Sequence, residues 1–390
     1  MFTSPDLNNM DTKNFLPDQY RQTNQLEINH NYLEKQFADR EAIWDKIRDV
    51  VVRGDFTLGA EVDLLEAEFA KLNGVKHAIG VGSGTDAIFL SLKALGIDKG
   101  DEVITTPFTF YATIGAIVTA GAKPVFSDAG DDFNIDPRHI EAKITPATKA
   151  IVPVHWSGKP CDMDTIERIA KKHKLAIVSD ACHAIKASYK GRPSGALGDV
   201  SCFSFHPLKN LNVWGDGGII ATNSDEIADR LRLLRNHGLV GRDECRVFAY
   251  NSRLDTIQAV VARHLMAKIE HITTSRVAHA AYFDVQLSGI PQVAVPSRNA
   301  DVYQVFHIYS VLCERRDELQ QYLIQHGVDA KAHYPTPMHL QPAASFLGHQ
   351  TGDFPVAERL GKETLSLPVH EFITQDQQAR VVALIKAFYG

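Results

Sequence analysis

The sequence predicts an α/β protein in which helices cover both faces of a parallel sheet. Short apolar runs alternate with amphipathic segments through the first half of the chain. Apolar strands roughly 20 to 30 residues apart, with a helix in each interval, are what such a sheet requires. The chain also has 390 residues, more than one hydrophobic core usually organises. We therefore expect a large α/β domain and a smaller second one.

The composition is that of an ordinary globular protein, with 44% hydrophobic and 23% charged residues. A net charge of -6 gives no electrostatic reason to expect nucleic acid or an acidic membrane surface as a partner. The five cysteines are widely spaced and form no CxxC pair. This pattern indicates reduced thiols in a cytoplasmic protein, and neither a disulfide framework nor a metal site. We also expect no signal peptide and no transmembrane segment.

The elements are expected in the following order. Residues 1–31 are rich in Asn, Asp and Gln and predict an N-terminal extension. One helix is expected from about Tyr32 to Gly54, and a second ends at Gly74 with a glycine C-cap. Strands then alternate with helices. The expected strands are residues 77–82, 101–106, 123–128, 149–155 and 175–180, and the expected helices are residues 86–95, 111–120 and 164–173.

The second half of the chain changes character. It begins with a long helical pattern over residues 253–287. Residues 303–313 alternate like a strand, and two more helices are expected. The helices are residues 316–327 and 381–389. These patterns predict a large α/β domain over residues 32–265 and a smaller C-terminal α+β domain over residues 266–390.

The stretch "GVGSGTDA", residues 80–87, lies between an expected strand and an expected helix. Backbone N–H groups at a helix N-terminus form an anion site, and small residues let a phosphate approach closely. The stretch is not the dinucleotide fingerprint, because Thr85 stands where the third glycine belongs, and it lacks the GK[ST] of a P-loop. The alternative is that these residues are merely a turn.

Asp180 ends a strand expected to be buried, at the edge where α/β proteins usually bind ligands. A buried carboxylate needs a partner. That partner is either a nearby basic side chain or backbone N–H group, or a cationic ring nitrogen of a cofactor. In the second case His183, three residues on, would lie beside the same ring.

Lys209 follows another strand end, Ser204, and precedes the glycine-rich turn "WGDGG". Most lysines are solvated surface charges. A desolvated lysine with a lowered pKa, however, is the nucleophile that reacts with aldehydes. A reactive lysine, a carboxylate for a ring nitrogen and a phosphate site are together what pyridoxal phosphate (PLP) requires.

Many stretches from about Gly54 to the C-terminus carry a family resemblance. They include "FTLGAEVDLLEAEFA", "GVGSGTDAI", "GDEVITTPFTFYAT", "DACHA", "CFSFHPLKNLNVWGDGG", "YNSRLDTIQA" and "HYPTPMHLQPA". In these the chain resembles the PLP-dependent sugar aminotransferases of the DegT/DnrJ/StrS type, which have the fold-type-I aspartate aminotransferase architecture. The resemblance implies a mostly parallel seven-stranded sheet in the large domain.

The resemblance also implies roles for individual residues. Lys209 matches the lysine that binds the cofactor covalently, Asp180 the carboxylate on its ring nitrogen, and Phe110 the aromatic stacked on its ring. His183 falls beside the ring hydroxyl. The matching phosphate-binding residues are Gly84, Thr85, Ser204 and, from the partner subunit of a homodimer, Asn251. The matching residues near the sugar are His155, Tyr334 and His339.

The implied reaction transfers an amino group from glutamate or glutamine to a keto-sugar, for a surface polysaccharide or lipopolysaccharide. The wording of residues 205–218 resembles a subgroup that acts on sugars without a nucleotide. Its acceptors are 8-oxo-Kdo, which gives 8-amino-8-deoxy-Kdo, or a 3-keto hexose phosphate.

Three alternatives stay open at this point. The first is a nucleotide-linked 3- or 4-keto-6-deoxyhexose as acceptor, and the second is a non-catalytic PLP-binding regulatory protein. The third is a sugar dehydratase of the same family. Dehydratases have His at the position that Lys209 holds here, and His206 is a different site, so this reading loses its main support.

Overall fold

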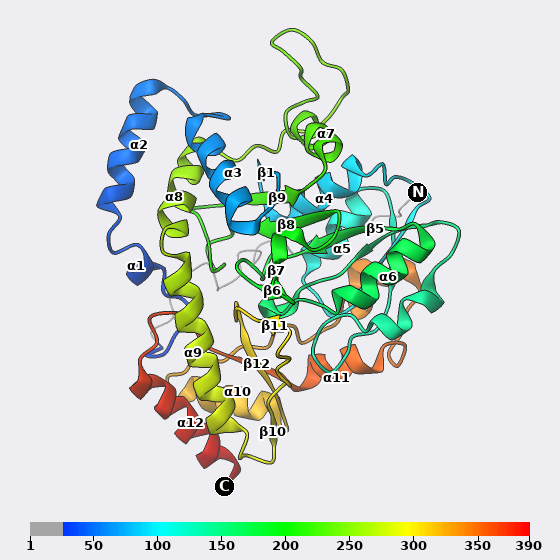
Figure 1. Cartoon of the computed structure of the whole chain (residues 1–390). Coiled ribbons are helices and arrows are strands. Elements are labelled where there is room, and N and C mark those ends of the chain that lie inside the picture. Colours follow the sequence, from blue (N-terminus) through cyan, green and yellow to red (C-terminus); the bar gives the residue numbers. More distant parts are fainter. Residues whose placement is uncertain (1–25) are drawn as a thin grey trace, which may run out of the picture.

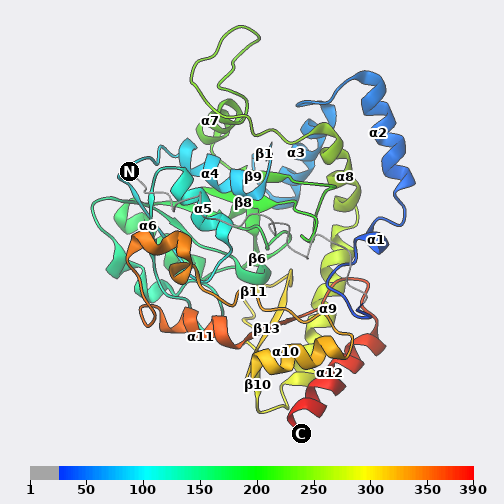
Figure 2. The same ribbon diagram turned by 180° about the vertical axis from the view of Figure 1, so that it is seen from behind.

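The computed structural model describes residues 26–390, and Figures 1 and 2 show it from two sides. The predicted N-terminal extension lies outside the described part, except for residues 26–31. The larger sheet has seven strands, and two smaller sheets have three strands each. The domain boundaries suggested by the sequence, at residues 32 and 266, stay predictions.

The seven-stranded sheet is mostly parallel, which confirms the predicted fold class. Its strand order is β1 (His77–Val81), β9 (Gly218–Thr222), β8 (Val200–Ser204), β5 (Ala176–Asp180), β4 (Thr148–Val152), β2 (Glu102–Thr105) and β3 (Lys123–Phe126). Within this sheet, β9 runs antiparallel to both of its neighbours. The other pairs are parallel. The carboxyl ends of β1, β8, β5, β4 and β2 therefore meet at one edge.

Helices cover both faces of this sheet, as expected. On one face α4 (Gly84–Ala94), α5 (Tyr111–Thr119) and α7 (Asp225–Arg235) share an apolar core with the central strands. On the other face lie α2 (Glu41–Arg53), α3 (Ala60–Asn73) and α8 (Thr256–Met266). α6 (Met163–His173) covers the neighbouring strands. Ile219 and Ile220 point into opposite cores, as alternation along a strand requires.

The smaller part of the structure is a three-stranded sheet with helices. Its strands are β10 (Val293–Ala294), β12 (Tyr309–Cys313) and β13 (Thr364–Leu367). Its core is shared with α9 (Ile269–Leu287), α10 (Arg316–Gln325) and α12 (Gln375–Tyr389). In both views α8 and α9 run end to end past the two parts (Figures 1 and 2).

The remaining elements are short. A second small sheet consists of β11 (Val302–Tyr303), β6 (Ser188–Tyr189) and β7 (Arg192–Pro193), and α11 (Pro355–Glu363) precedes β13. The 3-10 helices are η4 (Pro137–His139), η5 (Glu141–Lys143), η6 (Trp156–Gly158), η7 (Ser194–Ala196), η8 (Met338–Leu340) and η9 (Pro342–Leu347). No helix in residues 26–390 is long and apolar enough to cross a membrane.

Three expected elements differ from the structure. The helix expected from Tyr32 breaks between α1 (Leu33–Gln36) and α2, so that Tyr32 stacks on His370 while Phe37 packs on Trp214. The helix expected over residues 253–287 is two helices, α8 and α9. The strand expected over residues 303–313 is interrupted between Tyr303, which ends β11, and β12, because Phe306 has a φ of 49°, which no regular strand allows.

Candidate active site

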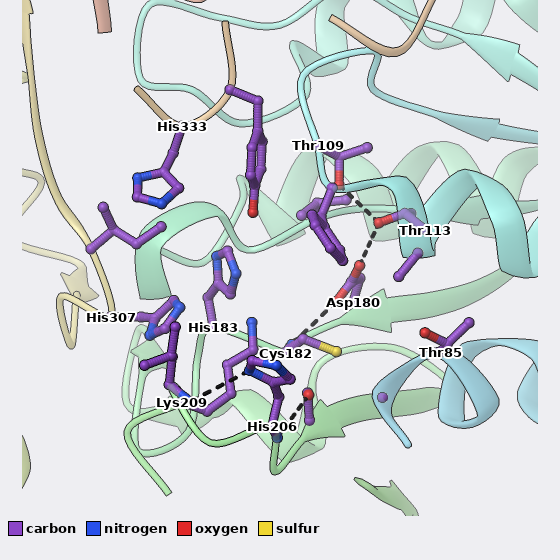
Figure 3. Close-up of a pocket in the computed structure, with 18 of the residues that line it drawn as sticks. Thr85, Thr109, Thr113, Asp180, Cys182, His183, His206, Lys209, His307 and His333 are labelled. Carbon is purple, nitrogen blue, oxygen red and sulfur yellow. Dashed lines mark hydrogen bonds between the residues drawn. The ribbon is translucent and has the colours of Figure 1, made fainter. Parts of the chain in front are cut away.

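A cavity of about 360 Å³ opens at the carboxyl ends of the parallel strands, and Figure 3 shows its interior. One side comes from strand ends and the turns that follow them, including Asp180, Ser204 and Thr109. The opposite side comes from the N-terminal segment, α9 and the small sheet. Its residues include His30, Tyr32, Arg276, Lys331, His333 and His370. Clefts at this edge of a parallel sheet are where α/β proteins bind ligands.

Asp180 is the last residue of β5 and is buried. Its Oδ2 accepts a hydrogen bond from the Thr113 hydroxyl at 2.8 Å, and its Oδ1 accepts one from the Cys182 backbone N–H at 3.2 Å. The Thr113 hydroxyl in turn lies 2.8 Å from that of Thr109. Both donors are neutral, so they orient the carboxylate without neutralising it. A cationic ligand group fits here.

His183 is buried beside the same cavity. Its Nδ1 accepts the backbone N–H of Ser157 at 3.3 Å, so the proton of the neutral ring is on Nε2. Burial, followed by Lys209 and His333, lowers the pKa of His183 well below its usual value. The ring therefore stays neutral and acts as a donor through Nε2. Its centroid is 4.3 Å from that of His307.

Lys209 extends into the same cavity as Asp180 and His183 (Figure 3). The turn that carries it is fixed by two hydrogen bonds. The Lys209 N–H donates to the His206 carbonyl at 2.8 Å, and Asn212 Nδ2 donates to the Lys209 carbonyl at 2.9 Å. Burial lowers the pKa of the Lys209 amine, against the opposing charges of Cys182 and Asp180. This is the environment of a reactive amine.

His206 lines the cavity as well but is engaged in the turn. Its N–H donates to the Ser204 hydroxyl at 3.3 Å, and its Nδ1 accepts the Leu208 N–H at 3.4 Å. Burial and the nearby Lys209 lower its pKa. The histidine thus lies beside Lys209, at a separate position.

The N-terminus of α4 points at the cavity from the strand side. Ser83 caps the helix by accepting the Asp86 N–H at 3.0 Å, while the earlier N–H groups of the first turn lack intrahelical partners. Gly84 is packed so closely that a Cβ atom there would lie 2.5 Å from the Cβ of Ser204. Together with Thr85 and Ser204, which line the cavity, this helix end is an anion site.

The aromatic residues form the rim of the cavity. Phe110 is 46% exposed at the start of α5, and its ring centroid lies 5.6 Å from that of Tyr334. Trp156 packs edge-to-face on Tyr334, with ring centroids 5.4 Å apart at an interplanar angle of 78°. Phe110 is thus placed to cover a planar group in the cavity.

Three predicted site residues lie elsewhere. Asn251 is exposed at the end of the loop after α7, where it pairs with Asn236. His155 is fully buried, with its Nδ1 accepting the Cys161 N–H at 3.2 Å. His339 is buried against Glu358, with Nε2 3.2 Å from Oε1. Neither histidine lines the cavity, and their contact with the sugar stays a prediction.

The sequence reasoning also missed cavity residues. His30 belongs to the expected extension, Tyr32 to the start of an expected helix and His307 to an expected strand, and Lys331 stands in no recognisable pattern. His333 immediately precedes Tyr334 in the stretch "HYPTP". Its position next to this predicted site residue is the one signal in the sequence that could have identified it. All these residues reach the cavity through contacts between distant parts of the chain.

The groups in the cavity fit PLP. A buried carboxylate with neutral donors suits a protonated ring nitrogen, a neutral His183 donor suits a ring oxygen, and the α4 end suits a phosphate. Lys209 lies among them as the amine for the aldehyde. The close packing of Gly84 on Ser204 leaves the helix end bare for an anion.

Comparisons with known proteins agree with a PLP site in this cavity. A sequence model of the DegT/DnrJ/EryC1/StrS aminotransferase family matches residues 38–386. The pleiotropic regulatory protein of Geobacillus stearothermophilus is 43% identical over 361 residues, which cover 92% of this chain and 97% of the relative. The dTDP-3-amino-3,4,6-trideoxy-alpha-D-glucose transaminase of Streptomyces venezuelae is 40% identical over 359 residues, or 90% and 95% of the two chains.

A solved structure matches equally well. The crystal structure of S. venezuelae DesV with a ketimine intermediate superimposes with a TM-score of 0.91 at 39% identity, and covers 93% of this chain and 98% of the other. Other solved relatives hold the cofactor in its PLP or PMP form. The fold, the sugar aminotransferase class and the PLP cofactor predicted from the sequence are thereby confirmed. The chain belongs to the DegT/DnrJ/EryC1/StrS aminotransferase family of PLP-dependent enzymes.

Proposed function

We propose that this enzyme transfers the amino group of glutamate to an anionic keto-sugar, with Lys209 and Asp180 as its catalytic residues. The observation that carries the proposal is the convergence of a desolvated Lys209, a buried Asp180 and the anion site of α4 on one cavity. Glutamine is the alternative donor.

The protein's own groups divide the work as follows. Bound PLP supplies an electron sink for the charge that develops at the α-carbon of the amino acid. Lys209 holds the cofactor aldehyde and then moves the proton at that α-carbon, because its lowered pKa favours the neutral amine that accepts a proton. Asp180 keeps the ring nitrogen protonated. His183 donates Nε2–H to the ring oxygen, and Phe110 covers the ring.

The acceptor is the finer part of the proposal. The wording of residues 205–218 supports a sugar without a nucleotide, either 8-oxo-Kdo or a 3-keto hexose phosphate, on the way to a surface polysaccharide or lipopolysaccharide. A specific observation supports a second candidate, a nucleotide-linked keto-sugar. Relatives 40% and 38% identical carry names that refer to UDP-N-acetyl-3-dehydro-alpha-D-glucosamine and UDP-2-acetamido-2-deoxy-3-oxo-D-glucuronate.

A panel of acceptors separates these candidates. The purified holoenzyme is incubated with glutamate and one acceptor at a time: 8-oxo-Kdo, a 3-keto hexose phosphate or a nucleotide-linked 3-keto-sugar. The masses of the products are then measured by mass spectrometry. We expect a mass that reports replacement of the keto oxygen by an amine for one acceptor class. Loss of a hydroxyl without amination, or no product with any keto-sugar, would contradict the proposal.

We also propose a homodimer that shares its active sites. The loop after α7 projects from the body of the molecule (Figure 1) and ends at Asn251. Phe248 in this loop is fully exposed, and Val247 and Tyr250 are partly so. Exposed apolar side chains of this kind fit a partner surface. The family resemblance of the sequence implies that Asn251 reaches the phosphate site of the partner subunit.

Complementation between two variants tests the shared site. Lys209→Ala and Asn251→Ala are each expected to be inactive as homodimers. Random co-expression gives about half mixed dimers, and each of these has one fully native site of its two, so about a quarter of the wild-type activity should return in the whole population. A monomer by native mass spectrometry, or no recovery in confirmed mixed dimers, would contradict the shared site.

A further inference from the structure

One wall of the substrate cavity is basic and lies apart from Lys209 and Asp180. We define the basic wall as His30, Lys331 and His333, which all line the cavity on the side away from β5 and β8. Figure 3 shows His333 above the cavity that Lys209 enters from below. The wall combines a segment near the N-terminus with a strand-like segment some 300 residues later.

The backbone fixes two members of the wall. The Lys331 N–H donates to the Ser366 carbonyl at 3.1 Å, and the Ser366 N–H donates to the Lys331 carbonyl at 2.7 Å. Alternate residues of an extended segment share a face, so Lys331 and His333 point the same way. The Ser366 hydroxyl lies 3.0 Å from His333 Nδ1. Nε2 of His333 is thereby left for a ligand.

His30 completes the wall from the N-terminal segment. Its backbone N–H donates to Asp329 Oδ2 at 3.1 Å, which holds the residue against the small sheet. Its ring is edge-to-face with that of His333, with centroids 6.2 Å apart. Its Nε2 is buried and has no hydrogen-bond partner. A buried polar atom without a partner is costly, so a ligand acceptor at this point would remove a penalty.

The charges of the wall are only partly compensated. Lys331 Nζ lies 3.2 Å from Asp329 Oδ2, and its side chain is 34% exposed while that of Asp329 is 7% exposed. An ammonium group has three donors, so one ion pair leaves others directed at the cavity. Burial is the main cause that lowers the pKa values of His30 and His333, and Lys331 lowers both further. His30 and His333 are therefore neutral, and Lys331 supplies the positive charge of the wall.

The neighbouring Arg276 is not counted in the wall, because both of its terminal nitrogens are engaged within the protein, and only its Nε has no hydrogen-bond partner in the described part of the chain. Its Nη1 donates to the carbonyls of Phe306 and His307 at 3.3 Å each, and its Nη2 donates to the Tyr32 hydroxyl at 2.6 Å. Glu371 lies 3.5 Å away as its ion-pair partner. Arg276 thus positions the N-terminal segment, and Lys331 is the cation that faces the substrate.

We propose that His30, Lys331 and His333 form a subsite that binds a carboxylate of the substrates. The Lys331 ammonium group and two histidine ring nitrogens line one region of a partly desolvated cavity, where charge-assisted hydrogen bonds are strongest. The cavity side opposite the wall carries the acids Asp180 and Asp216, so a carboxylate is directed away from Asp180 and towards the wall. The subsite adds a binding role to the proposed function. It depends on that proposal only where the carboxylate belongs to the keto-sugar acceptor.

The carboxylate has two sources, because donor and acceptor occupy one cavity in turn. Glutamate carries a carboxylate in the first half-reaction. An acidic keto-sugar carries one in the second. The half-reactions can be run separately, so the source is measurable. The enzyme with glutamate alone reports the donor, and its amine form with a keto-sugar alone reports the acceptor.

The test compares Lys331→Met with two controls. Lys331→Arg keeps the charge, and Lys76→Met breaks a surface pair of similar length, since Lys76 Nζ lies 3.1 Å from Asp225. Binding of maleate, a dicarboxylate that cannot react, is measured on each holoenzyme by calorimetry. The half-reaction constants are measured for glutamate, for a keto-uronate and for the matching keto-sugar with a hydroxymethyl group. His30→Leu is a second test of the subsite should Lys331→Met fail to fold.

We expect Lys331→Met to weaken maleate about tenfold or more, the usual cost of one charge-assisted hydrogen bond. The half-reaction constant should fall by a similar factor for glutamate, for the keto-uronate or for both. It should not fall for the neutral keto-sugar. Lys331→Arg should recover most of the affinity, and Lys76→Met should equal the wild type. Unchanged constants for both carboxylate substrates in Lys331→Met or His30→Leu would overturn the subsite. If the wild type aminates no keto-sugar, the proposed acceptor fails, while maleate and glutamate still decide the subsite.

Discussion

At the scale of single residues, the site depends on a buried carboxylate, Asp180, and a desolvated amine, Lys209. Asp180 is solvated by the Thr113 hydroxyl and the Cys182 N–H, and Lys209 is desolvated with a lowered pKa. An unpaired buried carboxylate costs several kcal/mol, roughly, unless a ligand compensates it. The cationic ring nitrogen of the cofactor offers that compensation. Both residues therefore favour binding of the same group.

The charge of Asp180 can be removed with little change in shape. In Asp180→Asn the side-chain oxygen still accepts the Cys182 N–H. We expect kcat/KM for glutamate to fall by about 10²-fold or more, the typical effect of losing one preorganised electrostatic contact. Thr113→Val removes a hydrogen bond and keeps the charge, so its loss should be smaller. Steady-state kinetics decide this, and equal losses in the two variants would contradict the role of the charge.

The residues at strand ends could be predicted because a local pattern marks them. Asp180 and Ser204 end apolar runs, and Lys209 precedes a glycine-rich turn. His30 and Lys331 have no such mark. His30 reaches the cavity because Asp329, far along the chain, accepts its N–H. The sugar contacts assigned to His155 and His339 came from the resemblance alone, and the cavity does not include them.

At the scale of elements, the N-terminus of α4 is the part of the cavity that we propose binds the phosphate. Ser83 caps the helix, and Gly84 packs against Ser204 with no room for a Cβ atom. The turn from β1 into α4 therefore presents bare N–H groups. The short turn "GVGSGTDA" is thus explained by packing as well as by anion binding.

Gly84→Ala tests this packing. The added methyl group would displace either Ser204 or the first turn of α4, so the affinity for PLP should fall about tenfold or more. Gly115→Ala in α5 is a matched control, because no atom lies within 4 Å of its added Cβ. The measurement is a titration of the apoprotein with PLP, followed by protein fluorescence. Equal affinities in the two variants would rule out a steric role for Gly84.

The regular elements were predictable and the breaks between them were not. Gly54 and Gly74 end α2 and α3 with φ of 68° and 62°, as a glycine C-cap predicts. The break between α8 and α9, by contrast, has no glycine or proline. It falls at Ala267 and Lys268, where apolar periodicity continues. Only packing against two different cores separates these helices.

At the scale of the whole molecule, the cavity is closed by parts that are distant in sequence. Tyr32 stacks on His370 with ring centroids 4.7 Å apart and accepts the Arg276 guanidinium N–H at 2.6 Å. Ile28 pairs with Val328. The segment from Ile28 to Tyr32 is therefore part of the active-site wall. Its composition, which is polar, predicted only an extension.

Buried neutral histidines make the stability of the fold dependent on pH. Burial lowers the pKa of His155, His333 and His370 to about 3 in each case. In the unfolded chain each histidine binds a proton as the pH falls below about 6.5, whereas in the folded chain the buried ring stays neutral to lower pH. The contribution of these neutral histidines to the free energy of unfolding is thus complete above about pH 6.5, and it is lost as the pH falls towards 3. Each can contribute up to about 1.4 kcal/mol per pH unit.

Urea unfolding at pH 7.5, 6 and 5 measures this dependence. The free energy of unfolding should fall steadily with the pH. His155→Gln should flatten the slope by about 1.4 kcal/mol per pH unit at most, whereas His271→Gln, at an exposed position, should leave it unchanged. A free energy of unfolding that is constant between pH 7.5 and 5 would contradict neutral burial of these histidines.

The central claim, that Lys209 is the amine through which this cavity transaminates, is tested most directly by the colour of the protein. The holoenzyme should be yellow, lose that colour when glutamate is added, and regain it with a keto-sugar, as two separate half-reactions require. In Lys209→Ala, turnover should fall by about 10²-fold to 10⁴-fold, the range for a lost general base, and the colour cycle should stop. A Lys209→Ala variant that completes the cycle at the wild-type rate would contradict the account.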